Sequence, residues 1–151
     1  MSNGIAINLE NKFAFNEDSV LIYTTHGCKV ILQGDVDDGD NHYFIILEFF
    51  DVISVRSAAT DCTPAFNIDS KKVGVSFVAE LTNSQWDDEA HLSYTYTGTK
   101  KITNRKHFVV TNHDVFHEVL GKSFVEQKIS RTSKDYQNIR LIYLYAKAQI
   151  L

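Results

Sequence analysis

The sequence predicts an α+β fold that is mainly β. We expect an antiparallel sheet or sandwich with one main amphipathic helix, at about residues 112–129, packed on it. Short runs of alternating apolar and polar residues recur along the chain, and one later segment has apolar residues at helical spacing. Hydrophobic residues make up 44% of the 151 positions, enough for one core, so we expect residues 1–151 to form a single domain.

Half-buried strands are expected where every second residue is apolar. Residues 73–81 and 91–98 alternate in this way. Shorter runs rich in β-forming residues are Val20–Tyr23, Lys29–Gln33 and Lys106–Val110.

Two further segments, His42–Phe50 and Ile139–Ala146, are apolar on both faces of a strand. Such a pattern is typical of a strand that is covered on both sides. We therefore expect both segments to be central strands, or strands at a sandwich or subunit interface.

The main helix is predicted from an apolar stripe with spacings of three and four residues. The stripe consists of Val115, Phe116, Val119, Leu120 and Phe124. Thr111 and Asp114 before it resemble a capping box, while Gly121 weakens the middle by about 1 kcal/mol relative to alanine. A second helical turn is expected at residues 84–89, where Ser84 is placed to cap and three acidic residues follow Trp86.

Charge is distributed unevenly along the chain, although the whole carries a formal net charge of only −4. Residues 1–70 hold eleven acidic and three basic side chains, and residues 71–151 hold eight acidic and twelve basic ones. This asymmetry bears on partners and association rather than on the fold.

Much of the acidic excess lies in the segment 35–41, between two predicted strands. An EF-hand is excluded because glycine stands fifth rather than sixth and Ile46 occupies the twelfth position, where glutamate is required. We interpret the segment as the acidic tip of a β-hairpin, with a loop cation as the alternative. Its candidate binding residues are Asp35, Asp37, Asp38 and Asp40.

The densest basic run follows the predicted strand that ends near Gly98. Its cations are Lys100, Lys101, Arg105 and Lys106. A solvated turn, a protein-binding patch and a nucleic-acid contact are the three interpretations. Nucleic acid is disfavoured because the pI is near 5.8 and no RNA-binding sheet motif is present.

Other residues suggest chemistry without a specific motif. His113 and His117 are spaced like two zinc ligands on one helix face, but no third ligand follows at a recognisable spacing. Glu48 interrupts an apolar face and is either a pocket acid or the partner of Arg56 or Arg140. Cys28 and Cys62 are favoured as buried thiols over a disulfide.

The leading hypothesis is a non-catalytic cytosolic protein-binding module, such as an immunity or inhibitor protein that steers its partner with an acidic surface. Trp86, with Asp87 and Asp88, is a second candidate surface, and a core role for Trp86 is the alternative. Other hypotheses are a subunit of a homo- or hetero-assembly, and a small enzyme or ligand-binding domain with a pocket between sheet and helix.

No phosphate loop, nucleophile elbow or dinucleotide fingerprint is present, so we favour a non-enzymatic role without a cofactor. The N-terminal residues lack a basic, apolar leader, and no apolar run is long enough to span a bilayer. We therefore expect a cytoplasmic protein that binds a protein partner or associates with itself, and no membrane partner.

Overall fold

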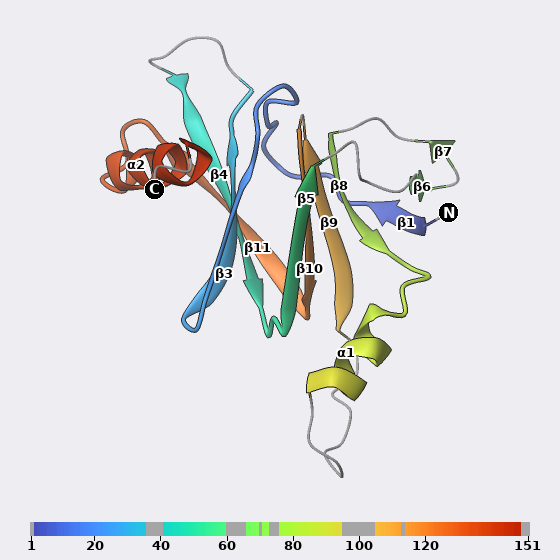
Figure 1. The fold of residues 1–151 in the computed structure, drawn as a ribbon. Helices are drawn as coiled ribbons and strands as arrows, with labels where there is room; N and C mark the ends of the chain where they lie inside the picture. Colours follow the sequence, from blue (N-terminus) through green and yellow to red (C-terminus); the bar gives the residue numbers. More distant parts are fainter. Residues whose placement is uncertain are drawn as a thin grey trace.

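The computed structural model describes residues 2–35, 41–59, 66–69, 71–72, 76–94, 105–112 and 114–148 (Figure 1). These residues form two β-sheets and two helices, which confirms the predicted mainly β, α+β fold. Neither described helix is long and apolar enough to cross a membrane.

The described strands form a four-stranded and a seven-stranded sheet. The small sheet has the order β11 (Ser123–Ser130), β4 (Tyr43–Phe50), β3 (Gly27–Gln33) and β2 (Val20–Thr24). The large sheet has the order β5 (Ser54–Ala59), β10 (Val115–Gly121), β9 (Lys106–Asn112), β8 (Phe77–Leu81), β1 (Ser2–Ala6), β6 (Phe66–Ile68) and β7 (Lys71–Lys72). The pairing is antiparallel except between β1 and β6.

The main core lies between the two sheets. The small sheet contributes alternate residues of β3 and β4, and the large sheet contributes residues of β8, β9 and β10. Phe49 of β4 packs against Phe108 of β9, with ring centroids 5.5 Å apart. In this packing, the face of β10 that carries Val119 is turned toward the small sheet.

Strand β4 is covered on both sides, as its two apolar faces predict. Tyr43, Ile45 and Leu47 face the inter-sheet core, whereas Phe44 and Ile46 belong to a second cluster beneath helix α2 (Tyr136–Ala148). Figure 1 shows α2 on the far side of the small sheet from the large sheet. The short helix α1 (Trp86–Tyr94) lies at one end of the large sheet.

Two short connections join the sheets at the same end of the molecule (Figure 1). One leads from β4 to β5 through Asp51, whose φ of 53° is left-handed and is tolerated best by glycine, asparagine and aspartate. The other leads from β10 to β11. Lys122 N–H donates to the Phe50 carbonyl at 2.9 Å, and Ile53 N–H donates to the Leu120 carbonyl at 3.0 Å. These two hydrogen bonds join the two connections.

The main helix predicted at about 112–129 is wrong, because this segment forms β10 and β11. The apolar spacing of three and four arises from a strand that is apolar on both faces. Val119 faces the inter-sheet core, while Phe116 and Leu120 face the opposite side of the large sheet. Pairing of β10 with both β5 and β9 then outweighs local helical periodicity.

The strand predicted at Ile139–Ala146 is also wrong, because this segment lies in helix α2. The helix buries Tyr136 and Tyr143 and half-buries Ile139 and Ala146, at helical spacing. The apolar residues between them are exposed, and they produced the misleading two-faced strand pattern. The strand predicted at 91–98 is contradicted over residues 91–94, which belong to α1, and residues 95–98 lie outside the described residues.

The remaining strand predictions are confirmed where the structure describes them. β2, β3 and β9 cover the runs that begin at Val20, Lys29 and Lys106, and β8 covers the second half of residues 73–81. Cys28 is a free, buried thiol whose pKa is raised to about 11 by burial. Cys62 lies outside the described residues.

Candidate functional site

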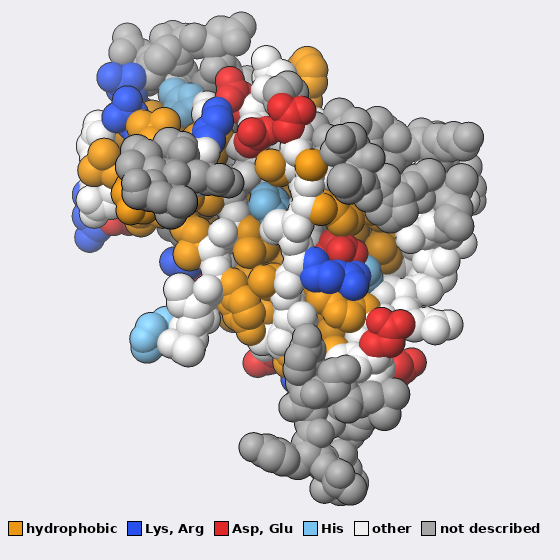
Figure 2. Space-filling view, in the orientation of Figure 1, with side chains coloured by type: hydrophobic (Ala, Val, Ile, Leu, Met, Phe, Trp, Pro, Cys, Tyr) orange, Lys and Arg blue, Asp and Glu red, His pale blue; other side chains and the backbone are white. Residues whose placement is uncertain are grey.

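A groove of about 470 Å³ lies between the edge strand of each sheet, β2 and β5. Its walls come from both edges, from β10 and from the end of α2. They include Val20, Leu21, Ser57, Ala58, Ala59, Val115, His117 and Ala146. Figure 2 looks onto this side of the molecule and shows hydrophobic side chains gathered between the two sheets.

His117 lines the groove with its imidazole almost fully buried, at 6% exposure. Its Nε2 lies 3.2 Å from the backbone carbonyl oxygen of Ser19, and its Nδ1 lies 2.7 Å from Ser57 Oγ. Because a carbonyl can only accept, the neutral ring carries its hydrogen on Nε2 and accepts the Ser57 hydroxyl hydrogen at Nδ1. Burial lowers the pKa of His117 and outweighs the opposing effects of Ser19 and Asp18.

Acidic side chains gather at one end of the groove (Figure 2). Asp18 and Asp114 line it, and Asp114 N–H donates to Asp18 Oδ1 at 3.1 Å. Glu17 lies next to Asp18 in the chain and pairs with Lys147 of α2 at 3.0 Å. The described groove therefore has walls of mixed character, with Ser57 and His117 among apolar side chains, and acidic side chains at this end.

The two edge strands give the groove a second property. β5 pairs only with β10 and β2 pairs only with β3 among the described strands, so each has one open side. An open side presents backbone N–H and C=O groups that an incoming strand can pair with. β5 is also small in side-chain volume at Ser57–Ala59, and these residues are exposed.

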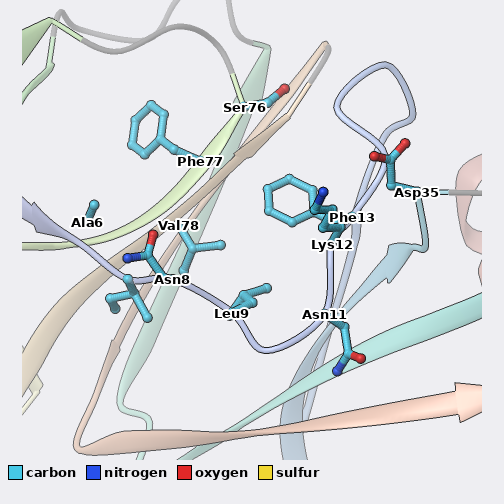
Figure 3. Close-up of a pocket in the computed structure, with 11 residues that line it drawn as sticks. Ala6, Asn8, Leu9, Asn11, Lys12, Phe13, Asp35, Ser76, Phe77 and Val78 are labelled. Carbon is cyan, nitrogen blue, oxygen red and sulfur yellow. The ribbon is translucent and has the colours of Figure 1, made fainter.

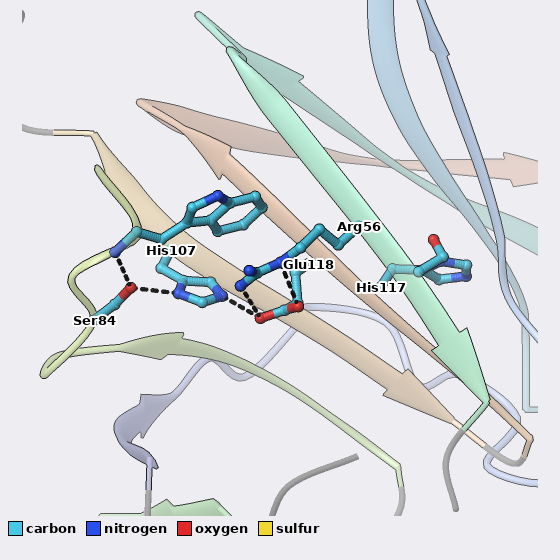
Figure 4. Close-up of polar contacts among 7 residues, drawn as sticks. Arg56, Ser84, His107, His117 and Glu118 are labelled. Atoms are coloured by element: carbon cyan, nitrogen blue, oxygen red, sulfur yellow. Dashed lines mark hydrogen bonds and ion pairs between the residues drawn. The ribbon is translucent and has the colours of Figure 1, made fainter. Parts of the chain in front are cut away.

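A polar network occupies the opposite face of β10 (Figure 4). Ser84 Oγ lies 2.6 Å from His107 Nδ1, and His107 Nε2 lies 2.6 Å from Glu118 Oε1. Arg56 donates two hydrogen bonds to Glu118, from Nε at 2.9 Å and from Nη2 at 3.0 Å. The backbone N–H of Trp86 donates to Ser84 Oγ at 3.1 Å, which connects the start of α1 to the network.

Glu118 is the charged centre of this network. Burial acts to raise its pKa, but hydrogen bonds and charge from His107 and Arg56 outweigh burial, and the pKa lies below its usual value. The guanidinium of Arg56 also lies over the Trp86 ring, 4.0 Å from its centroid. The network therefore holds an ionised carboxylate against a buried histidine.

The predicted binding residues are dispersed rather than brought together. Asp35 lines a separate cavity of about 400 Å³ beside the segment that precedes β2 (Figure 3). Asp37, Asp38, Asp40, Lys100 and Lys101 lie outside the described residues. Asp87 and Asp88 lie in the first turn of α1, Lys106 is the first residue of β9, and Arg105 directly precedes it.

Trp86 is a core residue at 7% exposure, which confirms the alternative interpretation of this side chain and removes it from the exposed surface. Its indole contacts the His107 ring with centroids 4.7 Å apart. Lys106 pairs with Glu80 at 3.5 Å. Arg105 donates to the Asp51 carbonyl at 3.4 Å.

The zinc hypothesis required His113 and His117 on one helix face, but His117 lies on strand β10 and His113 lies outside the described residues. Within the described ranges, no group of three or more His, Cys, Asp or Glu side chains is placed to hold a metal ion. Glu48 is half-buried on β4 opposite Lys29 of β3, and Arg56 pairs with Glu118 instead.

Helix α2 carries an exposed apolar face next to the groove. Leu141, Ile142, Leu144 and Tyr145 are between 42% and 64% exposed. Ala146 and Lys147 of the same helix line the groove. Sequence reasoning assigned these apolar residues to a buried strand and therefore missed this surface.

The residues that gather around β10 come from four distant segments and have no characteristic spacing. Ser57 carried no site signal in the sequence, Arg56 was considered only as a partner of Glu48, and Ser84 was expected only to cap a helix. His107 lay in a predicted strand, and Glu118 lay in a segment that was predicted to be a helix. Only antiparallel pairing of β5, β10 and β9 brings them into register, with His117 opposite Ser57 and Glu118 opposite Arg56. Comparisons with protein-family models, with curated proteins and with solved structures found no match.

Proposed function

We propose that this protein is a protein-binding module that receives an extended segment of a partner protein in the groove between β2 and β5. The observation that carries this proposal is the open groove itself, which has apolar side chains on both walls and is bordered by two edge strands that each have one unpaired side among the described strands. A concave apolar site with a few polar groups is the usual form of a binding site.

The backbone of β5 supplies the affinity in this proposal. A strand added to an open sheet edge forms main-chain hydrogen bonds, and its alternate side chains enter pockets along the edge. The exposed Ser57, Ala58 and Ala59 leave room for a close approach. Apolar side chains of the partner contact Val20, Leu21 and Val115, which line the same groove.

The acidic end supplies orientation. Asp18 and Asp114 line this end. A partner segment with a basic residue near one of its ends is therefore favoured in the direction that places this residue beside the acidic side chains. Such complementarity contributes mainly association rate and specificity. A cytoplasmic location, where thiols stay reduced, is consistent with the free thiol of Cys28.

The test uses a displayed library of random linear peptides, from which binders are selected on the purified protein. We expect selected peptides to alternate apolar residues and to carry lysine or arginine near one end. Ala59→Arg places a bulky cation in the groove and should weaken binding at least tenfold, about 1.4 kcal/mol. Val125→Arg is the matched control, because Val125 is 52% exposed on β11, the other edge of the small sheet.

Hydrogen exchange and backbone methylation test the mode of binding. The bound peptide should protect backbone amides of β5 from hydrogen exchange. N-methylation of those alternate peptide residues whose N–H groups point toward β5 should abolish binding. Equal loss with Ala59→Arg and Val125→Arg, or no protection of β5, contradicts the proposal. Concentration-dependent dimers that Ala59→Arg dissolves would assign the groove to a second copy of the chain instead.

A further inference from the structure

Three side chains outside the groove form one hydrogen-bonded line across the large sheet (Figure 4). Ser84 precedes α1, His107 lies on β9 and Glu118 lies on β10. Both links of the line are 2.6 Å long. A serine that contacts an imidazole, which is in turn oriented by a carboxylate, is the structural signature of an activated nucleophile.

The proton positions along this line follow from the acceptor at its end. Glu118 is held ionised by His107 and Arg56 and can only accept, so His107 carries a hydrogen on Nε2. The neutral ring then presents the lone pair of Nδ1 to Ser84, whose hydroxyl donates. The backbone N–H of Trp86 donates to the same Oγ at 3.1 Å, which fixes the direction of the hydroxyl and stabilises negative charge on Oγ.

The chain contains a second serine–histidine contact that lacks the carboxylate. Ser57 Oγ lies 2.7 Å from His117 Nδ1, but His117 Nε2 faces the backbone carbonyl of Ser19. A neutral carbonyl stabilises a developing imidazolium less than a carboxylate does. The two contacts therefore differ in the group that would support proton transfer.

Space for a small substrate lies beside the line. Two cavities of about 290 and 240 Å³ are both lined by Ser84 and His107. Arg105 and Lys106 line the larger cavity and bring positive charge near the serine, with Glu80 and Asp87 on the same walls. Cavities of this size and polarity suit a short acyl group rather than a long apolar chain.

We propose that Ser84 is a nucleophile toward small carboxylic esters, with His107 as general base and Glu118 as a positioning residue. Ser84 Oγ bonds to the ester carbonyl carbon, and its proton moves to His107 Nδ1. The bond from the carbonyl carbon to the alcohol oxygen then breaks, and that oxygen takes the proton from Nδ1. A water oxygen then bonds to the acyl carbon and gives a proton to His107 Nδ1. The bond from that carbon to Ser84 Oγ breaks and Oγ takes the proton from Nδ1, which yields the carboxylic acid and restores Ser84.

The test treats the purified wild-type protein with a fluorophosphonate probe and maps the labelled residue by mass spectrometry. We expect one label, on Ser84, and hydrolysis of p-nitrophenyl acetate that the label abolishes. His107→Gln should slow labelling at least about 100-fold, in the range of general-base contributions. His26→Gln is the control, because His26 is exposed beside the β2–β3 turn, and this variant should label as the wild type does.

Glu118→Gln separates positioning from a purely structural role. The imidazolium loses its anionic partner in this variant, so the labelling rate should fall, and Glu118→Asp, which keeps a carboxylate, should recover part of that rate. Circular dichroism checks that each variant is folded. A folded wild-type protein that is not labelled at Ser84 overturns the proposal, because that measurement needs no variant.

Discussion

Hydrogen bonding distinguishes the two serines that lie nearest His117. Ser57 Oγ contacts the imidazole, whereas Ser19 Oγ is buried without a hydrogen-bond partner among the described residues. Ser19 meets His117 through its backbone carbonyl instead. A buried hydroxyl without a partner retains the cost of losing its water.

Ser19→Ala is therefore expected to raise the free energy of unfolding by about 1 kcal/mol, because it removes an unsatisfied hydroxyl and leaves the carbonyl in place. Ser57→Ala should lower it by about 0.5–1 kcal/mol, because His117 Nδ1 loses its partner. Urea denaturation followed by circular dichroism measures both. Loss of stability in Ser19→Ala would show that this hydroxyl has a partner in solution.

Site residues were harder to predict than strands, and the reason is visible at Glu118. Sequence reasoning assigned residues 112–129 to a helix, where Glu118 and His117 would lie on neighbouring positions of one surface. On β10 they point to opposite faces of the sheet, so one meets Ser57 and the other meets His107 and Arg56. Side-chain direction followed from the kind of element, which local spacing did not determine.

Helix α2 is attached to the small sheet by a narrow stripe of buried side chains. Tyr143 is fully buried, donates its hydroxyl hydrogen to the Asp18 carbonyl at 2.6 Å and accepts from Gln33 at 3.2 Å. Its ring packs against Phe44, with centroids 5.4 Å apart. Most of the remaining apolar surface of the helix faces outward.

Tyr143→Ala is expected to lower the free energy of unfolding by about 3–5 kcal/mol, because it leaves a cavity beneath α2 and removes the hydrogen bond from the Tyr143 hydroxyl to the Asp18 carbonyl. Leu141→Ala should change it by less than about 0.5 kcal/mol, because Leu141 is 59% exposed. Chemical denaturation of both variants measures the difference. Similar losses in the two variants would place Leu141 in an interface.

Strands were predictable where burial of one face or of both faces produced a clear apolar pattern. β4 shows this best, because both of its faces are covered and its apolar run is continuous. The same rule failed for residues 139–146, because exposed Leu141, Ile142, Leu144 and Tyr145 imitate a buried face. Strands β1 and β5 were missed, since small and polar residues leave little apolar period to detect.

Two histidines couple the stability of the folded protein to pH. Burial lowers the pKa of His117. Burial also lowers the pKa of His42, and the charges of Arg131 and Arg140 add to the effect. His42 connects the small sheet to α2, through Nδ1 and the Tyr136 hydroxyl at 2.8 Å.

Both histidines bind protons more tightly in the unfolded chain than in the folded protein. Their contribution to stability is therefore complete above an unfolded pKa near 6.5 and is lost as pH falls below it. We expect the melting temperature to fall between pH 7 and pH 5.5. Glu118, whose pKa is also lowered, adds a separate loss only below about pH 4.5.

Differential scanning calorimetry across this range measures the effect. His117→Gln and His42→Gln should each flatten the slope between pH 7 and pH 5.5, and His26→Gln is the control because His26 is exposed beside the β2–β3 turn. An unchanged slope in both test variants would exclude these two histidines as its source.

The opposite directions of His117 and Glu118 also bear on how the chain finds its correct alignment during folding. A shift of β10 by one residue against its neighbours would carry Glu118 into the inter-sheet core and turn Val119 away from it. An ionised carboxylate among apolar side chains is strongly unfavourable. One acidic residue thus penalises misaligned pairings of this strand, whether or not the network that surrounds it has any chemistry of its own.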